Sequence, residues 1–212
     1  MPMVKTWVAD IRPLYEDACY QAFYERAPKF RRKKADRLNI RQGKAQSIGV
    51  WSLFEQMKKE YGIGEAAAYN FSHSGDYVLC SVIMNPEVFP VRVGCDIEKK
   101  EQCNLTLARR FFCASEYERI LAEQDEEERK TLFYRYWVLK ESFVKATRKG
   151  LTMGLDTFEI QHGSPSVLVR QPEEFPEAYY YREFETEDKD YRVAVCSTER
   201  AIETMTQMEL RI

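Results

Sequence analysis

The stretch VGCDIE, residues 93–98, combines the alternation of a buried strand with two acids one residue apart. Alternate side chains of a strand share a face, so the apolar positions would point into a core. Asp96 and Glu98 would then lie on the opposite face with Gly94, whose missing side chain leaves room for a ligand. The pattern predicts a core strand that carries two carboxylates. The core face would hold Val93, Cys95 and Ile97.

Strand and helix patterns extend outward from this stretch in two similar series. The first half predicts a strand at 3–11, helices at 14–25 and 29–61, the latter broken near Gly43, and strands at 68–74, 76–84 and 91–98. The second half predicts helices at 104–123 and 126–148 and strands at 157–161, 166–170, 178–184 and 191–197. Helices followed by strands, twice, predict an α+β fold of two related lobes, which we place at 1–100 and 101–212.

Composition limits the classes of protein to consider. The chain has 212 residues, of which 44% are hydrophobic and 31% charged, as in ordinary globular proteins. No window approaches 18 consecutive apolar residues, and the first residues lack the apolar core of a signal peptide, so we expect no membrane segment. Six cysteines without a Cys-x-x-Cys pair fit a reduced, cytoplasmic protein. With two histidines in all, His73 is the main candidate imidazole.

A basic segment lies near the start of the chain, inside a protein whose net charge is −2. Such a segment can bind an anionic ligand, bind nucleic acid, or form a solvated helix face. No nucleic-acid motif is present and aromatic residues are sparse there, so we expect no nucleic-acid partner. Its cations are Lys29, Arg31, Arg32, Lys33, Lys34, Arg37 and Arg41.

The paired acids admit two interpretations. Neighbouring carboxylates repel each other unless a cation lies between them, and Mg²⁺ binds one or two carboxylates together with substrate phosphates. The alternative is a solvated strand face that ends in the charged run at 98–101. Asp96 and Glu98 are therefore either metal ligands or surface charges.

A helical stripe supplies a third acid. Phe133, Trp137, Glu141 and Lys145 recur every four residues, so they lie along one helix face. An intrahelical Glu141–Lys145 salt bridge is the simpler explanation of the two charges. The other assigns Glu141 to a metal with the paired acids, and Lys145 together with Lys140 to phosphate oxygens.

The segment FSHSG, residues 71–75, is also ambiguous. Ser72 and Ser74 would share one strand face and His73 the other, which excludes a Ser–His dyad between neighbours. Ser-Gly-Asp is typical of a turn. The functional alternative is anion binding by Ser72 and His73.

In this order the segments resemble the surfactin-type 4′-phosphopantetheinyl transferases. FSHSG is matched, GCDIE at 94–98 matches the family's G-(I/V)-D-(I/V)-E, and WVLKESFVKATRKGL at 137–151 matches its W-x-x-K-E-x-x-x-K block. RRFFCASEYERI at 109–120 is similar to the family segment between the last two. The resemblance implies a monomeric pseudo-dimer of two similar α+β lobes, with the active site in the cleft between them.

The resemblance also implies an activity. Such proteins transfer the phosphopantetheine arm of coenzyme A to a serine of an apo acyl or peptidyl carrier protein and release adenosine 3′,5′-bisphosphate. Asp96, Glu98 and Glu141 would hold Mg²⁺, or Mn²⁺, at the coenzyme A diphosphate. Glu141, or a water that it positions, would take the serine proton, and Lys145 would neutralise phosphate charge. The other coenzyme A contacts would be Lys140, Ser72, His73, Arg31 and Lys34.

Two further points follow from the resemblance. The family's Gly-Lys-Pro segment before the FSHSG strand is missing here, which leaves open a descendant that binds coenzyme A or a carrier without turnover. A metal-dependent phosphohydrolase is the other alternative. Apolar residues at 111–121 would receive the carrier, or would simply pack within the lobe. They are Phe111, Phe112, Tyr117, Ile120 and Leu121.

Overall fold

The computed structural model describes residues 2–86, 90–187 and 189–212, and it confirms the α+β fold class. The helices are α1 (Asp17–Arg26), α2 (Lys29–Asp36), α3 (Arg41–Tyr61), α4 (Leu105–Phe111), α5 (Ala114–Ala122) and α6 (Glu126–Thr147). The strands are β1 (Met3–Asp10), β2 (Tyr69–Ser74), β3 (Tyr77–Met84), β4 (Val93–Lys99), β5 (Glu159–Gln161), β6 (Val167–Arg170), β7 (Tyr180–Glu185), β8 (Tyr191–Ser197) and β9 (Thr206–Met208). Within the described residues, none of the helices has the length and apolar character needed to cross a membrane.

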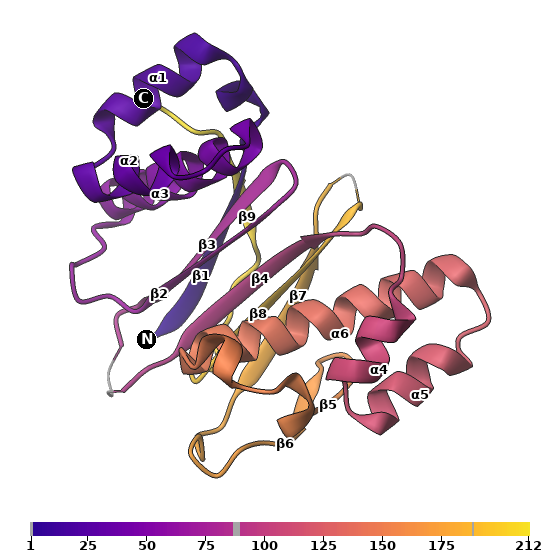
Figure 1. The fold of residues 1–212 in the computed structure, drawn as a ribbon. Coiled ribbons are helices and arrows are strands. Elements are labelled where there is room, and N and C mark those ends of the chain that lie inside the picture. The colour runs from indigo at the N-terminus through magenta and orange to yellow at the C-terminus, as the bar shows by residue number, and fades with distance from the viewer. Residues whose placement is uncertain (1, 87–89, 188) are drawn as a thin grey trace.

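The first sheet has the order β2-β3-β1-β9 and carries α1–α3 on its outer face (Figure 1). β3 pairs antiparallel with both β1 and β2, whereas β9 joins β1 in parallel. The long helix α3 turns its apolar stripe onto this sheet because the stripe recurs at helical spacing. Ile48, Leu53 and Met57 of this stripe are fully buried.

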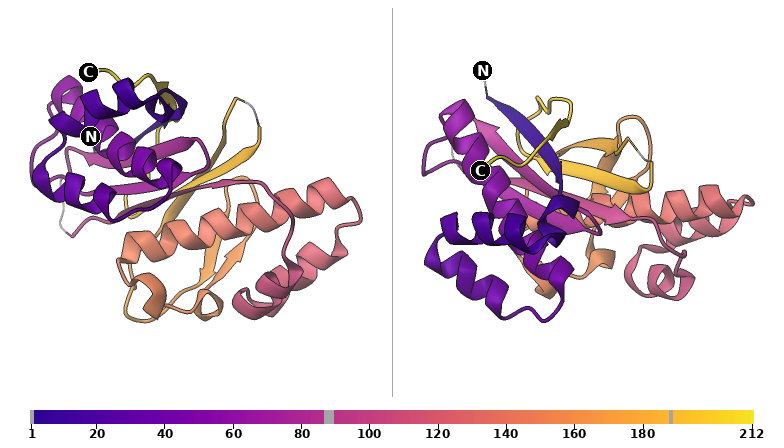
Figure 2. Two further views of the ribbon diagram at one scale, coloured as in Figure 1. Left: turned by 45° about the horizontal axis from the view of Figure 1, so that its top comes forward. Right: turned by 90° about the horizontal axis from the view of Figure 1, so that it is seen from above.

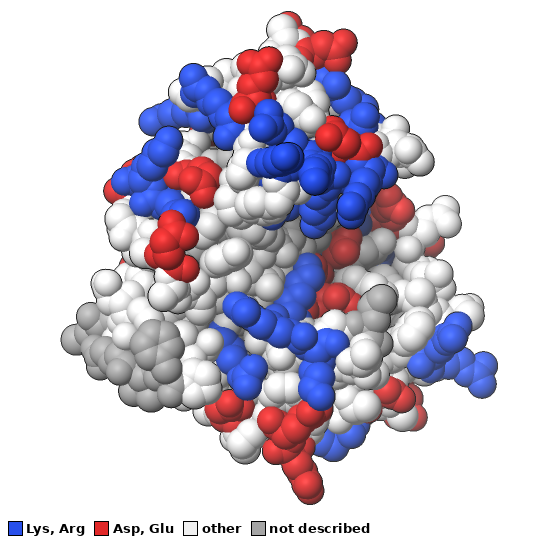
Figure 3. All heavy atoms as spheres, turned by 60° about the vertical axis from the view of Figure 1, so that its left-hand side comes forward, with Lys and Arg blue, Asp and Glu red and all other residues white. Residues whose placement is uncertain are grey.

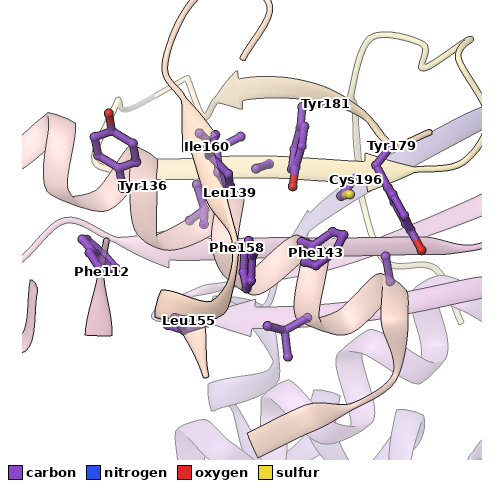
Figure 4. Close-up of a cluster of buried hydrophobic side chains, with 14 of the residues drawn as sticks. Phe112, Tyr136, Leu139, Phe143, Leu155, Phe158, Ile160, Tyr179, Tyr181 and Cys196 are labelled. Atoms are coloured by element: carbon purple, nitrogen blue, oxygen red, sulfur yellow. The ribbon is translucent and has the colours of Figure 1, made fainter. Parts of the chain in front are cut away.

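The second sheet, β4-β8-β7, is antiparallel and is covered by α6. Leu139 and Phe143 of α6 pack against Leu155 and Phe158, which precede β5 (Figure 4). The two sheets lie next to each other, with helices on their outer sides (Figures 1 and 2). Each half thus has a long helix on a mainly antiparallel sheet; a pseudo-twofold relation between the halves remains a prediction.

The sheets meet where β2 runs beside β4, and three β2 side chains join them. Asn70 Oδ1 accepts a hydrogen bond from the Cys95 backbone N at 3.1 Å. Ser72 Oγ accepts one from the Ile97 N at 3.3 Å, and Ser74 Oγ one from the Lys99 N at 3.1 Å. Every second residue of β2 therefore binds every second amide of β4. The predicted core face of β4 is confirmed: Val93, Cys95 and Ile97 are buried between the sheets.

Several sequence-based boundaries differ from the structure. The helix predicted at 29–61 is broken at 37–40, not at Gly43, which lies inside α3. The helix predicted at 104–123 is two helices, because Phe112 and Cys113 adopt extended backbone conformations. No sequence pattern predicted the short strand β9. β4 pairs with β8 and β9 returns to β1, so the two halves exchange strands. The lobe boundary at residue 100 stays a prediction.

The end of α6 is held by a residue in an unfavourable conformation. Arg148 caps the helix with φ 59° and ψ 17°, in the left-handed region that favours glycine. We expect Arg148→Gly to stabilise the protein by ~0.5–1 kcal/mol, because glycine adopts this conformation without strain. Arg148→Ala is the control, since it removes the side chain and keeps the strain. Urea unfolding should show a gain for the glycine variant only; equal midpoints for both variants would contradict the argument.

Candidate active site

α6 lies directly on β4 because Gly94 has no side chain. A Cβ at this position would clash with the backbone carbonyl oxygen of Ser142 and the backbone nitrogen of Ala146. The interpretation that Gly94 leaves room for a ligand is therefore wrong, because the helix backbone fills that space. This close approach brings Glu141 and Lys145 of α6 to the acids of β4.

Asp96 is the most deeply buried of the three candidate acids, with 2% of its surface exposed. Its Oδ1 accepts hydrogen bonds from Ser72 Oγ at 2.9 Å and from Lys145 Nζ at 2.6 Å. Its Oδ2 is buried and has no hydrogen-bond partner. Burial raises the pKa of Asp96, and the charge of Lys145 opposes that rise. An unpartnered buried carboxylate oxygen is an acceptor that a metal cation would satisfy.

Glu98 and Glu141 are half-buried, and the charge of Asp96 affects the pKa of both. Ser74 Oγ donates to Glu98 Oε2 at 2.8 Å. Burial, followed by the repulsion of Asp96, raises the pKa of Glu98 to about 7. The same two causes raise the pKa of Glu141. The three carboxylates thus share one electrostatic environment.

This donor set fits a hard divalent cation, because carboxylate oxygens are its preferred ligands and a cation would relieve their repulsion. In the part of the chain that the structure describes, however, no three His, Cys, Asp or Glu side chains are gathered closely enough to hold a metal ion. The three acids therefore have the donor atoms that a metal site needs, but their side chains are not gathered closely around one point.

Lys145 pairs with Asp96 and not with Glu141, so the intrahelical salt bridge is wrong. Its Nζ also donates to Ser72 Oγ at 2.8 Å. Burial disfavours the ammonium, but the charge of Asp96 and further partners outweigh burial and raise the pKa of Lys145. The site therefore holds a protonated lysine beside its most buried acid.

Ser72 and Ser74 face β4 and His73 faces away, as the alternation predicts. The Ser72 hydroxyl donates to Asp96 and accepts from Ile97 and Lys145, which uses its whole hydrogen-bonding capacity. The hydroxyl is therefore fully bonded within the protein, and the assignment of Ser72 to coenzyme A stays a prediction. His73 is exposed to solvent.

Positive charge surrounds His73. Desolvation by its surroundings and then the charges of Lys145 and Lys34 lower the pKa of the imidazole. Arg31 is buried with 8% exposed, its guanidinium 5.0 Å from the Trp51 ring centroid, so a fully solvated helix face does not describe it. Lys and Arg gather on both sides of a hollow in which acidic atoms are visible (Figure 3).

Lys140 does not reach the site, and its assignment to phosphate binding is wrong. It is fully buried in the second half, where its Nζ lies 2.8 Å from Glu116 Oε2. It also donates to the backbone oxygens of Leu155 and Phe158. The sequence carried a signal for this placement: Tyr136, Lys140 and Phe143 recur at helical spacing on the core face of α6.

A cleft of about 940 Å³ adjoins Lys145. No ligand-binding role was predicted from the sequence for its other lining residues, although Arg148 follows Lys145 in the same basic run. Among them are Tyr69, Phe71, Arg92, Val144 and Arg148.

The apolar segment considered for carrier docking is divided by burial. Phe112 and Ile120 are 4% and 0% exposed, so they belong to the core. Phe111 and Tyr117 are partly buried against the same core. Leu121 is 43% exposed and is the member of the set most accessible to a partner.

The raised pKa of Glu98 predicts a pH-dependent stability. Between its ordinary value of 4.5 and about 7, the folded state binds more protons than the unfolded state, so stability falls as pH rises through this range. Glu98→Gln removes the charge that Asp96 and Glu141 repel and Lys145 attracts. We expect this variant to exceed the parent protein by on the order of 1–2 kcal/mol at pH 8, allowing for the partial exposure of Glu98, and by little at pH 5. Urea unfolding in EDTA from pH 5 to 8 measures the difference; a constant difference would contradict it.

Comparison with known proteins shows which family the chain resembles. Residues 92–196 match the family model of the 4′-phosphopantetheinyl transferase superfamily. The 4′-phosphopantetheinyl transferase Sfp of Bacillus subtilis (strain 168) is 37% identical over 132 residues, which are 62% of this chain and 55% of that protein. The 4′-phosphopantetheinyl transferase psf-1 of Bacillus pumilus is 35% identical over 134 residues, 63% of this chain and 54% of that protein. A crystal structure of Thermotoga maritima holo-[acyl-carrier-protein] synthase has a TM-score of 0.44 and 22% identity, over 51% of this chain and 63% of that one.

Over residues 92–196 the chain is similar to the 4′-phosphopantetheinyl transferase superfamily. It is also similar to the Sfp-like, surfactin-type transferases of Bacillus, which confirms the resemblance drawn from the motifs. The chain spans about half the length of the curated relatives it matches.

Proposed function

We propose that this protein transfers 4′-phosphopantetheine from coenzyme A to a serine hydroxyl of an apo acyl or peptidyl carrier protein, releasing adenosine 3′,5′-bisphosphate. The observation that carries the proposal is the contact of Lys145 with both Asp96 and Ser72. Through it, a cation on α6 meets an acid on β4 and a serine on β2, beside Glu98 and Glu141. Acids and a fixed ammonium at one point are what a diphosphate and its counter-ion require.

Glu141 is the proposed proton acceptor for the carrier serine, directly or through a water that it positions. Its raised pKa makes it a stronger base than an ordinary glutamate. Lys145 would move from Asp96 to the phosphate oxygens that gain negative charge during transfer. His73, Arg31 and Lys34 would hold the 3′-phosphate end of coenzyme A. The charges of Arg31 and Lys34 already lower the pKa of His73, and the charge of Arg31 lowers that of Lys34.

Asp96, Glu98 and Glu141 are the residues that would hold Mg²⁺, or Mn²⁺. When bound, the metal would neutralise diphosphate charge. Asp96 has the free buried oxygen for it, and Lys145 now occupies the other oxygen. Both the metal and its ligand set are part of the proposal.

The first experiment is the intact mass of an apo carrier protein after incubation with this protein, coenzyme A and Mg²⁺, with a parallel sample in EDTA. We expect a gain of one phosphopantetheine group that EDTA abolishes. No gain on acyl and peptidyl carriers, with coenzyme A still bound in calorimetry, would favour a binding-only protein. Release of nucleotide or phosphate without a carrier would favour a phosphohydrolase.

A further inference from the structure

A buried ion pair anchors α6 on the side that faces the core of the second half. Lys140 and Glu116 are 0% and 1% exposed, and their charged atoms are 2.8 Å apart. Lys140 Nζ also donates to the backbone oxygens of Leu155 at 2.7 Å and Phe158 at 2.8 Å. Its three N–H groups therefore all have partners. The ammonium lies 4.4 Å from the Phe158 ring centroid as well.

Glu116 is bound as completely as its partner. Its Oε1 accepts a hydrogen bond from the Ile160 backbone N at 2.8 Å, and its Oε2 accepts one from the Cys113 N at 2.9 Å. The second bond closes a capping box at the start of α5. One ion pair thus connects α5, α6 and the segment that leads into β5.

We propose that Glu116 and Lys140 are positioning residues for the proposed transfer, on which this inference rests. Successive helical residues point about 100° apart, so a fixed Lys140 also fixes the direction of Glu141. The carbonyls that hold Lys140 belong to Leu155 and Phe158, which are themselves packed in the core (Figure 4).

The opposite side of α6 rests on Gly94 of β4. Two contacts on different sides of the helix fix its rotation, and Glu141 and Lys145 are thereby directed toward Asp96. A small rotation would misplace both residues, and misplacement of about 1 Å can reduce a rate by about 100-fold.

The positioning role and a purely structural role of the Glu116–Lys140 ion pair predict different results. One double variant distinguishes between these two roles. Lys140→Met alone leaves a buried unpaired carboxylate, which is strongly destabilising under either role. Glu116→Gln combined with Lys140→Met, which we call the neutral double variant, removes both charges at similar volume. The neutral double variant therefore avoids the buried unpaired charge that Lys140→Met leaves. The new glutamine has a single amide oxygen, so it can keep only one of the two backbone hydrogen bonds that Glu116 accepts. The new methionine has no donor for the two carbonyls that the lysine holds.

The experiment compares the parent protein, Lys140→Met, the neutral double variant and Phe143→Leu. Phe143 is a buried core residue of α6 outside the ion pair, so its variant controls for loss of stability. Each protein is assayed well below its melting temperature for carrier loading, with coenzyme A binding measured by calorimetry. We expect a melting temperature about 10 °C lower for Lys140→Met, and a smaller decrease for the neutral double variant because it leaves no buried unpaired charge.

The neutral double variant should nevertheless lose about 10- to 100-fold in kcat, while its KM for the carrier and its Kd for coenzyme A change less than about threefold. Phe143→Leu should keep the parent kcat. A neutral double variant with the parent kcat would overturn the positioning role, and so would an equal loss in Phe143→Leu. If the parent protein loads no carrier at all, the proposed function itself fails and this inference fails with it.

Discussion

Glu141→Ala should lower carrier loading by on the order of 10²–10⁴-fold, while the protein stays as stable as before or becomes more stable. Glu141 is half-buried, and burial together with the charge of Asp96 raises its pKa, so its carboxylate is held where repulsion disfavours it. Removing it relieves that repulsion, as at many sites where function and stability conflict. The loss of rate has a separate cause, since the variant lacks the proposed proton acceptor and one proposed metal ligand.

Two measurements on the same sample test this expectation: intact mass of the carrier over time, and urea unfolding. Glu128→Gln is the matched control, because Glu128 is an exposed acid at the other end of α6. It should load the carrier at the parent rate. Loss of both activity and stability in Glu141→Ala would show that Glu141 supports the fold, and an unchanged rate would remove it from the reaction.

The acids could be predicted from the sequence because strand alternation is a local rule. Residues 93–98 alternate without interruption, so the side of the strand that carries Asp96 and Glu98 followed directly. The four-residue spacing of Glu141 and Lys145 was equally informative. Their meeting with β4 was not in the pattern, since it depends on how α6 crosses the sheet.

Helix periodicity was sufficient to place Lys140 on the core face of α6, but not to identify its partner. Next to Glu141 in a charged pair, Lys140 was interpreted as a second phosphate ligand. Its spacing from Tyr136 and Phe143 placed it on the core face, but its partner Glu116 is 24 positions away in the chain. A buried charge is acceptable only when paired, and that pairing is a property of the tertiary structure.

The contact between the two sheets could not be predicted from the sequence, for a similar reason. Asn70, Ser72 and Ser74 show the alternation of a polar strand face, which is also what a solvent-exposed strand shows. The structure uses that face to bind the amides of β4. Sequence periodicity tells which side chains share a face, and it does not tell what the face meets.

Gly94→Ala should be the most disruptive single methyl group that can be added to the site. The new Cβ would clash with backbone atoms of α6 at Ser142 and Ala146, which cannot rotate away as a side chain can. We expect a loss of at least about 3 kcal/mol in unfolding free energy, at or beyond the upper end for overpacked cores. Whatever folded protein remains should have α6 displaced from β4, with the Lys145–Asp96 contact broken and carrier loading reduced with it.

Gly64→Ala is the matched control, because a Cβ there would meet no atom within 4 Å. It should unfold at the parent urea concentration and load the carrier at the parent rate. If Gly94→Ala also unfolds at that concentration, α6 can shift without cost, and the close approach of helix and strand is not what sets the site. If it is destabilised but retains full loading below its unfolding range, the contact serves the fold alone. Loss of both is the result expected when one backbone contact holds α6 on the second sheet and brings Lys145 to Asp96.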